Sequence, residues 1–120
     1  MQLLDSYFKI LAHTLSEDTH VFEVEMLASH PVYEGHFPGN PVSPGVCNMQ
    51  MIKECAEQVI GHAADLVEVK QYRLTGVIAP QLTPRLTIAL TLAAEADAMR
   101  LTARVSHGET VYIDFKGTLK

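Results

Sequence analysis

Apolar and polar residues alternate along much of the chain, which is typical of β-strands with one buried face. The clearest early stretch places four apolar side chains on one side, at Phe22, Val24, Met26 and Ala28. The same period of two returns in residues 86–92, 101–105 and 111–115. Weaker alternation predicts further strands over residues 7–15 and 66–78, with a short helix as an alternative for the first few residues.

Short polar segments separate the later strands. One is Glu95-Ala96-Asp97, and the next is Ser106-His107-Gly108-Glu109. Residues of these types favour tight turns between neighbouring strands. The pattern therefore predicts consecutive antiparallel hairpins in the C-terminal part of the chain.

One segment, from Pro44 to about Ala64, has no alternation and no internal proline. Its apolar residues gather on one flank when the chain is wound at 100° per residue, at Val46, Met49, Ile52, Ala56, Val59, Ile60 and Ala63, with Met51 and Cys55 extending the flank. Polar residues occupy the remaining arc, at Gln50, Lys53, Glu54, Glu57 and Gln58. Ser43 can cap such a helix and Pro44 suits its first position. A single helix of about 30 Å is expected.

One long helix among five or six antiparallel strands can bury its apolar flank only against the sheet. The predicted fold is therefore α+β, with the helix wrapped by a curved sheet. A chain of 120 residues fits one domain over residues 1–120, with no linker or repeat.

Composition narrows the classes of function. The formal net charge of −5 and the scattered Lys and Arg residues argue against nucleic-acid binding. No apolar run approaches the roughly 20 residues of a membrane-spanning helix, so we expect a cytoplasmic protein without membrane insertion. Cys47 and Cys55 are expected to be small buried residues of a reducing compartment. No metal-ligand spacing is present, so no metal is expected. We expect no organic cofactor either.

The stiff segment 35–45, "GHFPGNPVSPG", carries the candidate chemistry. If Ser43 is the N-cap, its Oγ takes the Val46 amide and leaves the Gly45 amide free at the positive end of the helix. Such an amide can polarise a thioester carbonyl and stabilise an enolate. His36 lies nine residues upstream, and an imidazole is a suitable proton shuttle near neutral pH.

Residues 36–46, "HFPGNPVSPGV", resemble the signature of the hot-dog-fold 3-hydroxyacyl-[acyl-carrier-protein] dehydratases. The order of strands, one long helix and more strands is also similar to that family. The resemblance implies a hot-dog fold, a homodimer or higher oligomer, and dehydration of 3-hydroxyacyl thioesters in fatty acid or related lipid synthesis. The substrate would be carried by acyl carrier protein or coenzyme A.

By the same resemblance, His36 matches the catalytic histidine and Gly45 matches the glycine whose amide holds the thioester carbonyl. Active sites of the family lie between subunits, so the histidine of one subunit faces the helix of the other. The resemblance also points to substrate contacts, at Phe37, Gly39, Pro44, Val46 and Glu54.

Two departures from the family stand out. The acidic position of the family falls on Gln50, whose amide has no proton to exchange near neutral pH. The Pro-Gly-Asp turn of many members is replaced by Pro80 and then Pro84-Arg85.

Three explanations of Gln50 remain open. Glu54 replaces the acid from one turn away, or His36 performs both proton transfers while Gln50 orients the hydroxyl, or the site binds thioesters without dehydrating them well. The second is preferred. The alternatives to a dehydratase are a hot-dog acyl thioesterase and an acyl-binding protein with impaired catalysis. Four arginines are candidates for contacting an acidic carrier protein, at Arg73, Arg85, Arg100 and Arg104.

Overall fold

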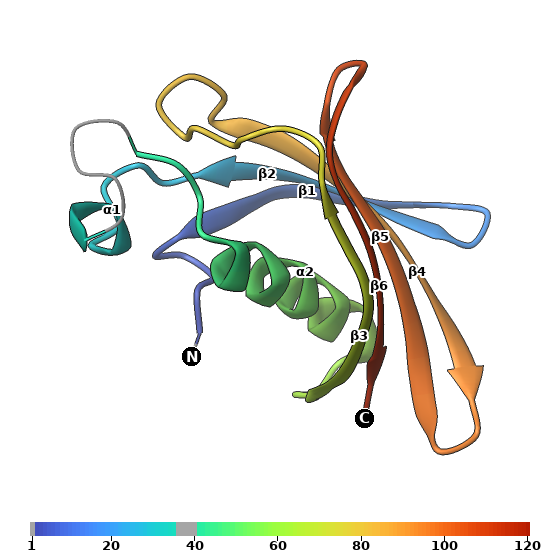
Figure 1. The fold of residues 1–120 in the computed structure, drawn as a ribbon. Helices are drawn as coiled ribbons and strands as arrows, with labels where there is room; N and C mark the ends of the chain where they lie inside the picture. Colours follow the sequence, from blue (N-terminus) through green and yellow to red (C-terminus); the bar gives the residue numbers. More distant parts are fainter. Residues whose placement is uncertain (1, 36–40) are drawn as a thin grey trace.

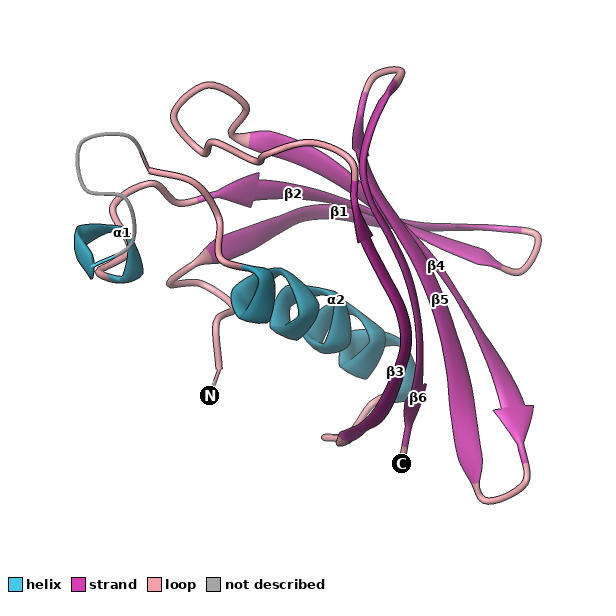
Figure 2. Ribbon diagram, viewed as in Figure 1, coloured by secondary structure: helices cyan, strands magenta, loops and turns pink. Residues whose placement is uncertain are grey.

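The computed structural model describes residues 2–35 and 41–120. In these residues the strands form one antiparallel sheet in the order β1-β2-β4-β5-β6-β3. The strands are β1 (Phe8–Ser16), β2 (Thr19–Met26), β3 (Leu66–Leu74), β4 (Arg85–Glu95), β5 (Ala98–His107) and β6 (Thr110–Leu119). The helices are α1 (Val32–Gly35) and α2 (Gly45–Ile60). The sheet curves around α2, while the short α1 lies beyond the N-terminal end of α2 (Figure 1, Figure 2). The α+β hot-dog fold expected from the sequence is confirmed.

The alternation of the strands produces one continuous apolar face. Phe22 pairs with Ile88, Ile88 with Val105, and Val105 with Ile113, so one row of side chains crosses β2, β4, β5 and β6. All four side chains are at most 1% exposed. This row packs in the same core as Met51, Ile52 and Cys55 of α2. The concave face of the sheet is therefore dry because α2 covers it.

Tight turns join the strands as the polar segments predicted. Ala96, between β4 and β5, has a φ of 55°, and Gly108, between β5 and β6, has a φ of 58°. Both hairpins are confirmed. Strand β3 ends at Leu74 rather than reaching residue 78, and the first residues form a turn with a single bridge from Leu4 to Phe8 instead of a helix.

Helix α2 is shorter than predicted, and its buried face is displaced. It spans 16 residues, or about 24 Å, because Gly61 adopts a left-handed φ of 82° and its N–H bonds to Glu57 O at 2.9 Å. Val46, expected on the apolar flank, is 62% exposed. The buried residues of α2 are Cys47, Asn48, Met51, Ile52, Glu54, Cys55 and Ala56. The prediction placed the polar Glu54 on the outer arc, and that placement is wrong because its carboxylate is occupied inside the chain.

The start of α2 also differs from the prediction. Pro44, not Ser43, is the N-cap residue, with φ −71° and ψ 144°, and no side chain in residues 2–35 and 41–120 caps the helix. Ser43 instead donates its backbone N–H to Ile78 O at 2.7 Å. A cap at Ser43 would require the helix to begin one residue earlier, at a proline whose geometry here remains extended.

No helix in residues 2–35 and 41–120 has the length and apolar character needed to cross a membrane.

Candidate active site

Gly45 is the first residue of α2, and its amide faces the space in front of the helix. Within the described part of the chain, nothing accepts a hydrogen bond from its N–H. A Cβ at this position would lie 3.5 Å from the Tyr72 hydroxyl, with no closer neighbour. The positive end of the helix dipole and an uncapped N–H together favour a partially negative oxygen here.

Asn48, one turn along α2, links this region to the core. It is fully buried and accepts a hydrogen bond from Tyr7 Oη at 3.3 Å, while its Nδ2 donates to Tyr72 Oη at 3.3 Å. Because Tyr72 Oη accepts from Asn48, its own proton is available to donate elsewhere. The hydrophobic pattern did not predict a function for Asn48. The available signal was a polar residue between Cys47 and Met49, within an otherwise apolar stretch.

An aromatic cluster surrounds the same end of α2. Tyr7 stacks on Tyr33 at 5.9 Å between ring centroids and meets the His30 ring edge-on at 5.5 Å. Burial raises the pKa of Tyr7 far above its usual range, with the Tyr33 hydroxyl adding to the effect. Burial also raises the pKa of Tyr33. Tyr33 Oη and the buried Ser43 Oγ lie near Tyr7 Oη, but neither oxygen forms a hydrogen bond with a described residue. These phenols therefore stay protonated and act as structural or hydrogen-bonding groups.

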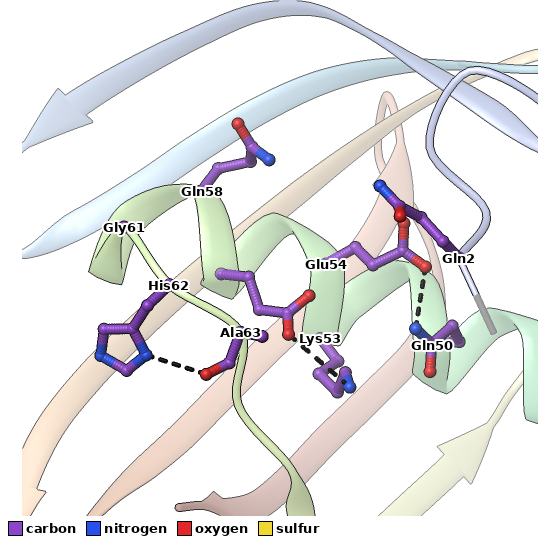
Figure 3. A pocket seen from close by; sticks show the side chains of 9 residues that line it. Gln2, Gln50, Lys53, Glu54, Gln58, Gly61, His62 and Ala63 are labelled. Atoms are coloured by element: carbon purple, nitrogen blue, oxygen red, sulfur yellow. Dashed lines mark hydrogen bonds and ion pairs between the residues drawn. The ribbon is translucent and has the colours of Figure 1, made fainter.

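Gln50 and Glu54 form a second polar group, on the side of α2 facing the N-terminal segment. The Glu54 carboxylate is 4% exposed and accepts the backbone N–H of Leu3 at 2.8 Å and that of Leu4 at 2.8 Å. Gln50 Nε2 donates to Glu54 Oε2 at 2.9 Å, and Figure 3 shows this bond with the Gln50 oxygen directed away from Glu54. Beside them, a polar cavity of about 500 Å³ follows the helix toward His62.

Glu57 plays a related part at the other end of this cavity. Its carboxylate accepts the N–H of Ala64 at 2.8 Å and pairs with Lys53 at 3.6 Å. Two carboxylates on α2 therefore bind the chain segments that flank the helix in sequence. Glu54 binds the N-terminal segment, and Glu57 binds the segment that follows the helix.

The predicted site residues fall into three groups. His36, Phe37 and Gly39 lie outside the described residues. Pro44, Gly45 and Val46 come together at the start of α2, with Val46 pointing outward. Gln50 and Glu54 follow one and two turns later, but Glu54 is engaged with Leu3, Leu4 and Gln50 rather than exposed to a ligand.

Both cysteines are free and buried, as the sequence predicted. Burial raises the pKa of Cys47, and burial together with the Glu54 charge raises the pKa of Cys55 well above the usual thiol range. A thiol that stays protonated is a poor nucleophile and a poor metal ligand. In the described ranges, no three His, Cys, Asp or Glu side chains are grouped to hold a metal ion.

Solved structures with similar folds include proteins of several bacteria. One chain of the dehydratase heterocomplex ApeI:P from Xenorhabdus doucetiae superposes with a TM-score of 0.72 at 12% identity, covering 92% of this chain and 95% of that one. A conserved protein of Pseudomonas aeruginosa gives 0.66 at 11% identity, covering 95% and 87% of the two chains. An uncharacterized protein from Erwinia carotovora gives 0.59 at 19% identity, covering 90% and 87%. These likenesses support the fold.

Sequence comparison adds the family. Two curated relatives are 3-hydroxyacyl-[acyl-carrier-protein] dehydratases FabZ, from Levilactobacillus brevis (38% identical over 55 residues) and Chlamydia trachomatis serovar L2 (32% over 53). The matches cover 40% and 44% of this chain but only 37% and 35% of the relatives' own lengths. A much longer match, over residues 12–113, is to the family model described as ApeI-like, ApeI dehydratase. With most of its length matched and a hot-dog fold around α2, the chain belongs to the ApeI-like dehydratase family.

Proposed function

We propose that this chain dehydrates 3-hydroxyacyl thioesters of acyl carrier protein to trans-2-enoyl thioesters. The observation that supports this proposal most is the Gly45 amide at the start of α2, whose N–H has no acceptor among the described residues. It lies in the same signature as His36, nine residues along the chain. Membership of a dehydratase family supports the reaction type, and the FabZ relatives support the carrier-linked substrate.

In the proposed reaction, His36 removes a proton from C2 of the substrate. The Gly45 amide stabilises the negative charge that develops on the thioester oxygen. The electron pair forms the C2–C3 double bond as the C3–O bond breaks, and the imidazolium returns its proton to the departing hydroxide to give water. Gln50 of the second subunit holds the 3-hydroxyl, and no cofactor takes part.

A second subunit in this proposal pairs along β3. This strand closes one edge of the sheet, and among the described strands it pairs with β6 alone. Val67 and Val69 on it are 56% and 44% exposed. An exposed apolar edge strand is a favourable surface for pairing with a second copy. The family resemblance supports a dimer with active sites between the subunits.

Of the four arginines predicted to contact an acidic carrier protein, two have no acidic partner among the described residues. Arg104 is bonded to Asp114 at 2.9 Å and Arg100 lies 3.8 Å from Glu95. Arg73 and Arg85 are exposed and have no ion pair with any described residue. We therefore place these two first among the residues that an acidic carrier protein would meet.

The direct test supplies a 3-hydroxyacyl thioester of acyl carrier protein and follows enoyl absorbance and free thiol separately. Enoyl formation that His36→Ala abolishes and His62→Gln leaves intact supports the proposal, because His62 is an exposed histidine whose ring bonds to Ala63 O of its own turn. Free thiol without enoyl product would identify a thioesterase. Binding without either product would identify an acyl-binding protein.

Gly45→Ala gives a second test. The added methyl meets only ordinary contacts with Tyr72 and should not prevent folding. It narrows the space beside the N–H on the side of Tyr72 and hinders close approach of the thioester oxygen, so we expect kcat/KM to fall about tenfold or more. An unchanged kcat/KM would show that the thioester carbonyl does not bind the Gly45 amide.

A further inference from the structure

Glu54 presents only acceptors to its surroundings. Its Oε1 accepts from Leu3 N at 3.0 Å and Leu4 N at 2.8 Å, and its Oε2 accepts from Leu3 N at 2.8 Å and Gln50 Nε2 at 2.9 Å. Since the side chain is 4% exposed, solvent does not compete for these positions. A carboxylate held in this way requires a donor at every contact.

That requirement fixes the orientation of the Gln50 amide. The Gln50 oxygen placed against Glu54 Oε2 would bring two acceptors together in a partly buried position, so the nitrogen occupies this side. Figure 3 shows the result, in which Gln50 Oε1 points away from Glu54. The amide therefore presents its acceptor end on the side opposite Glu54.

We infer that Glu54 is a positioning residue that holds Gln50 with its oxygen toward the substrate, so that the site selects thioesters carrying a hydroxyl at C3 over those carrying a ketone. This inference rests on the proposed function. A 3-hydroxyl group can donate its proton to Gln50 Oε1, whereas a 3-oxo group has only acceptors and faces a repulsive contact. In this inference, Gln50 Oε1 stands where the family has an acidic side chain. The buried carboxylate of Glu54, one turn away, sets the orientation of the Gln50 amide.

The binding test uses a variant without turnover. In a His36→Ala background, the Kd of a 3-hydroxyacyl thioester and of its 3-oxo counterpart, both on acyl carrier protein, are measured by calorimetry. We expect about tenfold or greater preference for the hydroxyl compound. Adding Glu54→Gln should bring the ratio toward one, because a neutral amide at position 54 tolerates either orientation of Gln50.

The matched control is Glu57→Gln, on the same helix. It removes the same charge and a similar backbone contact, with Ala64 N–H, but does not touch Gln50. It should leave the ratio unchanged. The inference would be overturned if the ratio of the two Kd values were the same with and without Glu54→Gln, or if Glu54→Gln and Glu57→Gln lowered the preference for the hydroxyl compound equally.

The side-chain amide of Gln50 gives a readout that needs neither substrate nor a stable Glu54 variant. In ¹H–¹⁵N spectra of the wild-type chain, assigned through Gln50→Asn, one amide proton should be shifted downfield by the carboxylate and well separated from the other. Two protons at ordinary positions would contradict the fixed orientation. If wild type binds neither thioester, the proposed function fails, while this spectrum still decides whether Glu54 orients Gln50.

Discussion

Asn48 occupies a fully buried position in α2 between two tyrosines of distant segments. It joins Tyr7, before β1, to Tyr72 in β3 through two hydrogen bonds of 3.3 Å. A polar side chain in such a place is tolerated only when its partners are satisfied. The sequence showed an isolated asparagine there, but which residues lie opposite it depends on how the sheet folds over the helix.

Replacing Asn48 by Ala should lower the free energy of unfolding by about 1–3 kcal/mol, because Tyr7 Oη loses its buried acceptor. Urea denaturation measures the change. Adding Tyr7→Phe to Asn48→Ala removes the unsatisfied hydroxyl and should recover part of the loss. Equal stability of Asn48→Ala and wild type would show that the Tyr7 bond contributes nothing.

Cys55 should make the fold sensitive to alkaline pH. Its pKa is raised in the folded chain by burial and by the Glu54 charge, whereas an unfolded thiol ionises near about 8.5. The contribution of Cys55 to stability is therefore constant below that pH and falls above it, because only the unfolded state releases the proton. Between about pH 8.5 and 9.5 the contribution is at most about 1.4 kcal/mol.

Denaturation curves of wild type and Cys55→Ala at both ends of this pH range test the prediction. The variant should lose less stability than wild type over the same interval. Parallel losses in the two proteins would assign the alkaline sensitivity to other groups.

Strands and helix differ in how far local sequence determined them. Alternation is set by which face of a strand is buried, so β2, β4, β5 and β6 were recognisable from the sequence. The limits of α2 depend on single backbone positions, namely extended Pro44 and left-handed Gly61. Ser43, Pro44 and Gly45 are all compatible with a helix start, and the bond from Ser43 N–H to Ile78 O favours the later one.

Strand β6 contains a close approach that only glycine allows. A Cβ on Gly117 would lie 2.8 Å from the backbone oxygen of Glu68 in β3. Gly117→Ala should therefore force β3 away from β6 and cost about 1–3 kcal/mol of stability, measurable by thermal or urea denaturation. Gly35→Ala is the control, since its Cβ meets no described residue within 4 Å. Equal effects of the two substitutions would contradict the proposed close approach.

For the molecule as a whole, the proposed site is complete only when a second subunit pairs at β3. Val69→Lys places a charge on this exposed edge and should convert the oligomer to monomer, as measured by light scattering after gel filtration. Because Gln50 would then be missing from the site of each His36, activity should fall together with the oligomer. Leu15→Lys, at the opposite edge strand β1 and 61% exposed, should change neither. A monomeric wild type, or an active monomeric variant, would remove the second subunit from the site.

The sequence by itself determined the strand pattern, the single long helix, the burial of both cysteines and the family, because each follows from local periodicity or from a contiguous motif. Tertiary structure alone decided the ends of α2, the bridge through Asn48 and the use of Glu54 to hold both the N-terminal segment and Gln50. The bonds from Tyr7 to Asn48 and from Leu3 to Glu54 join residues 41 and 51 positions apart. Their partners are fixed only when the sheet and the N-terminal segment have closed around the helix, so no local pattern contains them.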